Sequence, residues 1–179
     1  MSKELASPSA EFYKAMVRAG RVKRWHTVDT VATQNVADHT YGVMATLMFI
    51  TDGEASRALL LAALSHDILE GITGDVPHPF KRQYPDEYKF LEDAAESQLP
   101  EGFAPTISKE EMNLLKVADL LECGVWATHE LALGNAGALP IMLNVLRSVN
   151  GMEIPKRAMS ILDSLEHNVS KYSGEKNET

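Results

Sequence analysis

Histidine and aspartate side chains interrupt three otherwise apolar stretches of this sequence. His66 and Asp67 are adjacent and end the run ALLLAALSHD. His39 lies within VADHTYGVMATLMFI, and Asp119 lies within LLKVADLLE. Burying such groups without partners costs roughly several kcal/mol, and one shared metal ion would remove that cost for all of them. Two imidazole nitrogens and two carboxylate oxygens suit zinc, manganese, cobalt or ferrous iron, and they leave positions open for water and substrate.

Each of these residues also has an ordinary interpretation when it is considered alone. His66 and Asp67 could be a helix-end histidine beside a solvated aspartate, and His39 could be a core histidine bonded to a carbonyl. Asp119 could pair with Lys116 three residues before it on a helix. These interpretations need several independent polar intrusions into one small core, whereas a single metal site explains all of them. The pattern therefore favours a metal centre.

The order of these residues, H…HD…D, resembles that of the HD-domain phosphohydrolases, which are all-helical, metal-dependent enzymes. The similarity extends to RW at 24–25, NVADHT at 35–40 and SHDILEGITGDVPHPFK at 65–81. These segments are similar to those of the small HD-type 5′-deoxynucleotidases, and equally to those of the compact phage enzymes that hydrolyse deoxynucleoside triphosphates. The resemblance implies an all-α fold, a bound divalent metal ion such as zinc, cobalt or manganese, and a deoxynucleotide substrate.

The resemblance also implies a role for each matching residue. The positions that match the family's metal ligands are His39, His66, Asp67 and Asp119. Glu70 matches an acid that acts on the attacking water, and Asp75 matches an acid that positions the water or the leaving group. Arg24 matches a residue that contacts phosphate, and Trp25 matches one that packs against the nucleoside.

Phosphate-ester hydrolysis needs these kinds of group on physical grounds as well. A bound metal lowers the pKa of water toward about 7 and so supplies a nucleophile at neutral pH. Glu70 or Asp75 could exchange a proton near the leaving oxygen, and the planar guanidinium of Arg24 could neutralise phosphate oxygens. Trp25 offers an aromatic wall for a base or sugar. Core packing of Trp25 and a surface ion pair of Arg24 are the alternatives.

The length of the substrate's phosphate chain depends on charge beyond the metal site. Lys81 and the adjacent Arg82 could reach the distal phosphates of a triphosphate, or they could be solvated surface charges. We expect a triphosphohydrolase of the dATP type, which releases nucleoside and triphosphate. The alternative is a 5′-deoxynucleotidase that acts on deoxynucleoside monophosphates.

Two further function classes fit the pattern less well than these enzymes. A hydrolase of guanosine tetraphosphate or cyclic dinucleotides fits less well, because Arg24, Trp25 and the segment GDVPHP point to nucleotidases. A non-catalytic nucleotide sensor would be expected to lack a metal ligand or the catalytic acid. All of these residues are present here, so the pattern favours an enzyme.

Helices must position these residues, because strand-like alternation of polar and apolar residues is missing. Helical patterns cover about 7–19, 35–50, 56–70, 86–95, 108–126, 139–149 and 155–171. Ser7 is a predicted N-cap, as is Ser108 with Glu111 in a capping box. The segments GDVPHPFKRQYP and 100–105 are rich in proline or glycine and should be loops. We predict an all-α fold, a single compact HD-type bundle of about seven helices over residues 1–179, with a polar tail from about residue 173.

Composition limits the partners of the chain. Its 179 residues carry a formal net charge of −8, which does not suit binding to a nucleic-acid polymer. A single cysteine, Cys123, excludes a disulfide framework. No run is apolar enough to span a membrane or to form a signal peptide, so we expect a cytoplasmic protein, or one of the host cytoplasm if a phage encodes it. Apolar stripes near Met142, Leu146, Met159 and Leu162 suggest a homo-oligomer.

Overall fold

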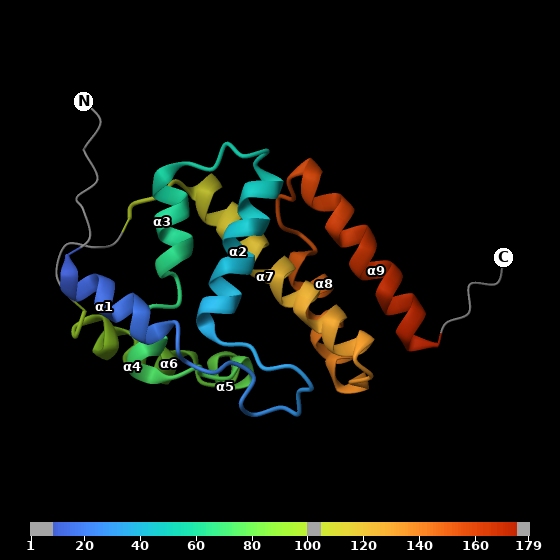
Figure 1. Cartoon of the computed structure of the whole chain (residues 1–179), viewed down its shortest axis with the longest axis horizontal. Coiled ribbons are helices and arrows are strands. Elements are labelled where there is room, and N and C mark those ends of the chain that lie inside the picture. The colour runs from blue at the N-terminus through green and yellow to red at the C-terminus, as the bar shows by residue number, and fades with distance from the viewer. Residues whose placement is uncertain (1–8, 100–104, 175–179) are drawn as a thin grey trace.

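All regular elements in the described part of the chain are helices (Figure 1). The computed structural model describes residues 9–99 and 105–174. The α-helices of this part of the chain are α1 (Ala10–Ala19), α2 (Val36–Ile50), α3 (Arg57–Ser65), α4 (Glu70–Thr73), α5 (His78–Gln83), α6 (Pro85–Glu96), α7 (Lys109–Ala132), α8 (Leu139–Val149) and α9 (Met159–Ser173). Within the same residues no strand forms, and one isolated bridge joins Lys23 to Asn35. The predicted all-α class is confirmed.

The seven helices expected from the sequence correspond to α1, α2, α3, α6, α7, α8 and α9, and the two short helices α4 and α5 add to them. The expected first cap, Ser7, lies outside the described residues, and Ser9 caps α1 instead by accepting a hydrogen bond from the Phe12 N–H. Most of the loop expected at 100–105 and of the polar tail also lies outside them. No helix in the described ranges is long and apolar enough to cross a bilayer.

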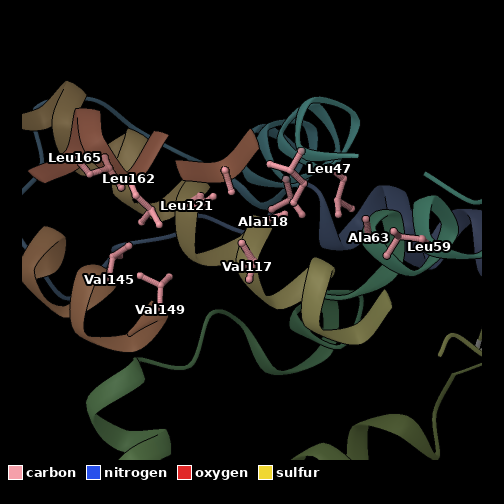
Figure 2. Close-up of a cluster of buried hydrophobic side chains, with 13 residues drawn as sticks. Leu47, Leu59, Ala63, Val117, Ala118, Leu121, Val145, Val149, Leu162 and Leu165 are labelled. Atoms are coloured by element: carbon pink, nitrogen blue, oxygen red, sulfur yellow. The ribbon is translucent and has the colours of Figure 1, made fainter. Parts of the chain in front are cut away.

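Helix α7 forms the centre of the main apolar core, with α2 and α3 on one side and α8 and α9 on the other (Figures 1 and 2). Leu121 and Val117 of α7 are fully buried there. Figure 2 shows them between Leu47 of α2 and Val145 of α8. Helices α2 and α7, which carry the predicted metal ligands His39 and Asp119, are therefore held side by side by the core itself.

Capping boxes fix where α2 and α7 begin. The Asn35 side chain accepts from the Asp38 N–H, and the Asp38 carboxylate accepts from the Asn35 N–H. Ser108 and Glu111 form the same reciprocal pair at the start of α7, as the sequence predicted. The cap at Asn35 sets the first turn of α2, and His39 follows in its second turn.

The prediction of one continuous helix over 56–70 was wrong. Helix α3 ends at Ser65, and the chain makes turns before α4 begins at Glu70. The Nδ1–H of His66 donates to the carbonyl of Ala63, which in a continuous α-helix would bond to the Asp67 N–H. The bonds then tighten to an i to i+3 pattern, as from the Ile68 N–H to the Ser65 carbonyl.

The prediction of a loop throughout GDVPHPFKRQYP was also wrong, because α5 occupies its second half. Proline is compatible with the first turn of a helix, where its missing N–H has no intrahelical partner, and Pro79 takes such a position.

A close contact places α4 against α1. A Cβ on Gly71 would lie 3.1 Å from the backbone of Ala19, so glycine allows the two segments to approach.

Candidate active site

His39 and His66 direct their Nε2 atoms toward the same point. His39 projects from α2 and is fully buried, and His66 directly follows α3. Their Nε2 atoms are 3.2 Å apart. The Oδ2 atom of Asp67 lies 3.3 Å from His66 Nε2 and 3.6 Å from His39 Nε2. The ligand atoms of the three residues all lie within 4.8 Å of one another, so they form a candidate metal-binding group.

The hydrogen bonds of the two imidazoles make this group suitable for a cation. His66 Nδ1 is 2.6 Å from the carbonyl oxygen of Ala63, which can only accept, so Nδ1 carries the proton. His39 Nδ1 bonds to the carboxylate of Glu122. In the neutral tautomers both Nε2 lone pairs therefore face each other. Two lone pairs at this distance repel unless a proton or a metal ion lies between them, and such outer hydrogen bonds are typical of metal-binding histidines.

Asp119 lies next to this group of three residues but is not part of it. One oxygen, Oδ1, is 3.3 Å from His39 Nε2, and the other, Oδ2, is 2.8 Å from Lys116 Nζ. The ion pair with Lys116 is present in the structure, and the assignment of Asp119 as a metal ligand stays a prediction. Its carboxylate faces the histidines and also pairs with the lysine three residues before it.

Electrostatics shows how strongly positive charge is favoured here. Burial lowers the pKa of His39, but hydrogen bonds to Asp119 and Glu122 outweigh it and raise that pKa to about 9. Burial would raise the pKa of Asp67, but the hydrogen bond from His66 and the nearby positive charges lower it to about 2. Asp67 is thus held as an anion and His39 as a cation, and a divalent cation bound here would replace the proton of His39 as the positive charge beside the carboxylates.

Arg24 lies beside the candidate metal group, as predicted for a phosphate-contacting residue. Its guanidinium donates to Asp67 Oδ2 at 3.0 Å through one terminal nitrogen. Its Nε donates to the Gln34 side-chain oxygen at 3.2 Å. The side chain is 13% exposed, so the alternative of a surface ion pair is excluded and the cation is held at the edge of the site.

Trp25, in the segment after α1, contacts Asp75, Gln34 and Trp126. It has a positive φ of 60°, which is unusual for a non-glycine residue. Its backbone N–H donates to Asp75 Oδ2 at 3.1 Å, and its indole N–H donates to Gln34 at 2.8 Å. Its ring stacks on Trp126 with centroids 4.3 Å apart. Asp75 thus holds the backbone of the segment that carries Arg24.

Glu70 is buried at the start of α4, next to the candidate metal group. Burial, together with the charges of Asp67 and Asp75, raises the pKa of Glu70 to about 7. Its Oε2 atom is buried and has no hydrogen-bond partner among the described residues. A carboxyl group that titrates near neutral pH and has a free oxygen is suited to accept and release a proton.

Two cavities border Asp67. A polar cavity of about 40 Å³ is lined by Glu70, Lys81 and Tyr88 among others, and Lys81 Nζ lies 4.9 Å from the centre of the Tyr88 ring. Arg82 is exposed and is not among the residues that line it. A larger, apolar cavity of about 230 Å³ lies between α1 and α2. A charged group suits the first cavity, and an uncharged ring suits the second.

Two residues of the site were missed by the sequence interpretation. Glu122 and Gln34 are buried, and the Gln34 amide N–H donates to Glu122 at 2.8 Å. Glu122 follows Asp119 by three residues and so shares its face of the helix, but its contact with His39 depends on the packing of α7 against α2. Gln34 carries no comparable signal, since it lies in a polar connection between helices.

Comparison with known proteins assigns the chain to a family. A family model described as 5′-deoxynucleotidase YfbR-like matches residues 11–165. The chain belongs to this family. One relative, the 5′-deoxynucleotidase of Vibrio atlanticus (strain LGP32), is 30% identical over 150 residues, which cover 70% of this chain and 77% of that protein. The 5′-deoxynucleotidase YfbR of Escherichia coli (strain K12 / DH10B) is 34% identical over 151 residues, 70% of this chain and 75% of that protein.

Solved structures confirm the fold of the family. The cyanophage S-2L HD phosphohydrolase DatZ, described as bound to dA and one catalytic zinc ion, superposes with a TM-score of 0.61 at 20% identity, over 93% of this chain and 99% of that one. The PH0347 protein of Pyrococcus horikoshii OT3 gives 0.66 at 19% identity, over 89% and 99%. The predicted HD phosphohydrolase class is confirmed, and the protein is an enzyme of that class.

Proposed function

We propose that this enzyme is a 5′-deoxynucleotidase, which hydrolyses deoxynucleoside monophosphates to nucleoside and phosphate with the help of one divalent metal ion. The observation that carries the proposal is the convergence of His39, His66 and Asp67 beside the buried Glu70. Membership of the YfbR-like family and the curated 5′-deoxynucleotidase relatives support the substrate class.

Each residue of the site has a proposed task. His39, His66, Asp67 and Asp119 would hold the ion, which when bound supplies a water of lowered pKa as nucleophile. Glu70 takes a proton from the water, because its raised pKa suits exchange near neutral pH. Arg24, fixed by Asp67 and Gln34, neutralises charge on the phosphate oxygens. Asp75 keeps Arg24 and Trp25 in place through the Trp25 N–H.

The charge around the site favours a monophosphate over the triphosphate that the sequence led us to expect. That expectation rested on the pair Lys81 and Arg82. Lys81 lines the polar cavity beside Glu70, but Arg82 is exposed and does not. One lysine and Arg24 suit a single phosphate, whereas a triphosphate would need more cations to offset its charge in a chain of net charge −8. The comparisons also favour the 5′-deoxynucleotidase alternative.

A substrate panel tests the proposal. The purified protein is incubated with dAMP, dATP and AMP in the presence of cobalt or manganese, and inorganic phosphate, triphosphate and nucleoside are quantified. We expect phosphate and deoxyadenosine from dAMP, with little turnover of dATP. Triphosphate released from dATP without phosphate from dAMP would replace this function by the triphosphohydrolase. The Asp67→Ala variant controls for contaminating phosphatases.

Assembly into a homo-oligomer stays a prediction. Met142 is fully buried within one chain and Leu162 is nearly so, which leaves Leu146 and the exposed Met159 of the apolar residues that suggested it. Multi-angle light scattering of the purified protein gives the mass directly. A mass near the 19.7 kDa of one chain would contradict the prediction.

A further inference from the structure

Glu122 is buried on α7 and contacts two residues of the candidate site, His39 and Gln34. One carboxylate oxygen bonds to His39 Nδ1, and the other accepts from the Gln34 amide at 2.8 Å. We propose that Glu122 is a positioning residue that couples the metal ligand His39 to the phosphate-contacting Arg24, with Gln34 as the connection. This inference rests on the proposed function for the tasks of His39 and Arg24.

The chemistry of a carboxylate fixes the orientation of both of its partners. An ionised carboxylate only accepts hydrogen bonds, so His39 must present an N–H at Nδ1, and its Nε2 is left for a metal ion. For the same reason Gln34 must present its NH2 group to Glu122. One side chain therefore sets the direction of an imidazole and of an amide.

The orientation of Gln34 then determines what the amide oxygen can hold. That oxygen faces away from Glu122 and accepts from the Trp25 indole N–H at 2.8 Å and from Arg24 Nε at 3.2 Å. Gln34 is 6% exposed, so water does not compete freely for these bonds. A reversed amide would place its NH2 group against two donors. By fixing the orientation of Gln34, Glu122 therefore also fixes the acceptor that holds Arg24 and Trp25.

The neighbouring helix leaves room for this arrangement. Gly42 follows His39 by three residues on α2, so it lies on the same face of the helix. A Cβ at that position would lie 2.6 Å from Cγ of Glu122. The absence of a side chain at Gly42 thus leaves space for the Glu122 carboxylate beside α2, where it bonds to His39. Gly42→Ala should displace the Glu122 side chain.

A titration of the metal alone tests the first half of the coupling. Zinc affinity is measured by competition with a chelator for the wild type, Glu122→Gln and Glu130→Gln. Glu130 is a matched control, because it is also a buried acid on α7 but accepts hydrogen bonds from the Val31 and Ala32 N–H groups. We expect Glu122→Gln to weaken zinc binding by about 10- to 100-fold, since its amide can donate to Nδ1 and reverse the tautomer. Wild-type affinity in Glu122→Gln would overturn the proposal.

The Gln34→Leu variant tests the second half. It should bind zinc within about twofold of the wild type but raise KM for dAMP by about tenfold with a smaller change in kcat, because Arg24 loses one of the hydrogen bonds that hold its guanidinium. The near-ultraviolet circular dichroism of the Trp25–Trp126 stack should weaken as well. Unchanged KM and unchanged dichroism would show that Gln34 does not position Arg24 or Trp25, and would overturn the coupling.

Two readouts keep this inference separate from the proposed function. Zinc affinity and dichroism need no turnover, so they remain decisive if dAMP is not the substrate. Nitrogen-15 spectra of the histidines in the zinc-loaded wild type need no variant that could fail to fold. They should show His39 with its proton on Nδ1, and a proton-free Nδ1 would contradict the assigned role of Glu122.

Discussion

The two sides of the candidate site are built very differently. The candidate metal-binding side, formed by His39, His66, Asp67 and Asp119, lies on or directly after α2, α3 and α7, which share the main core (Figure 1). The catalytic-acid side, formed by Glu70, Asp75 and Lys81, lies on two short helices and the segment between them. No residue of α5 is buried. The helices of the first side are therefore anchored in the main core, whereas α5 on the second side contributes no buried residue.

The largest effect is expected on the metal-binding side. Asp67→Ala removes a candidate ligand, the partner of Arg24 and a neighbour of both histidines. Turnover of dAMP should fall by about a thousandfold or more, because metal and phosphate contacts together contribute several kcal/mol to the transition state. Stopped assays of phosphate release measure it. The exposed Asp86→Ala on α6 is the control, and activity within about tenfold of wild type in Asp67→Ala would remove the metal assignment.

The next effect lies on the catalytic-acid side. Glu70→Gln keeps the shape of the side chain but cannot take a proton, so kcat should fall by about 100-fold or more. Zinc affinity should stay close to that of the wild type, because Glu70 is not part of the ligand group. A parallel loss of zinc binding would show that the two sides are not independent, and the comparison would fail.

A pH series gives a third test of the same residue. The pKa of Glu70 is raised to about 7 from an ordinary value of 4.5. The ionised form is the base, so kcat should rise as pH increases through about 7. In the metal-free protein the contribution of Glu70 to folding stability is fully present below about pH 4.5, where its carboxyl group is protonated in both the folded and the unfolded state. This contribution is lost as the pH rises through about 7, because the buried carboxylate becomes charged. Thermal unfolding should therefore show Glu70→Gln gaining stability over the wild type from pH 5 to pH 8.

The smallest effect is expected at Lys81. Its α5 helix has no buried residues, and the amine is held over the Tyr88 ring without a carboxylate partner in the ion pairs of the described residues. Lys81→Ala should raise KM for dAMP by no more than about fivefold, because Lys81 is partly exposed and a solvent-screened charge contact is worth about 0–1 kcal/mol. Steady-state kinetics measures it. A loss of more than about a hundredfold would give Lys81 a central part in phosphate binding and would revive the triphosphate interpretation.

The difference between the two sides also explains what the sequence could predict. The candidate metal-binding residues stand out because each is a polar side chain within or at the end of an apolar stretch, and the helices α2 and α7 carry strong capping signals. The geometry confirms that His39, His66 and Asp67 converge. Their assignment as metal ligands stays a prediction.

The parts that the sequence did not reveal depend on tertiary contacts. Helix α5 was hidden because Pro77 and Pro79 resemble loop residues, although they suit the start of a helix. The positive φ of Trp25 is held by Asp75, fifty residues later in the chain. Glu122 resembled an ordinary helix acid, since only the packing of α7 against α2 brings it to His39. Such pairings are set by the fold and not by local spacing.

The most direct test of the metal centre is an anomalous diffraction map of crystals grown with manganese or zinc. We expect one peak per chain, at about 2.0–2.2 Å from Nε2 of His39 and His66 and from carboxylate oxygens of Asp67 and Asp119. Side chains of Glu70 and Lys81 should lie outside that coordination distance. A peak elsewhere in the molecule, with none between the two Nε2 atoms and Asp67, would contradict the account.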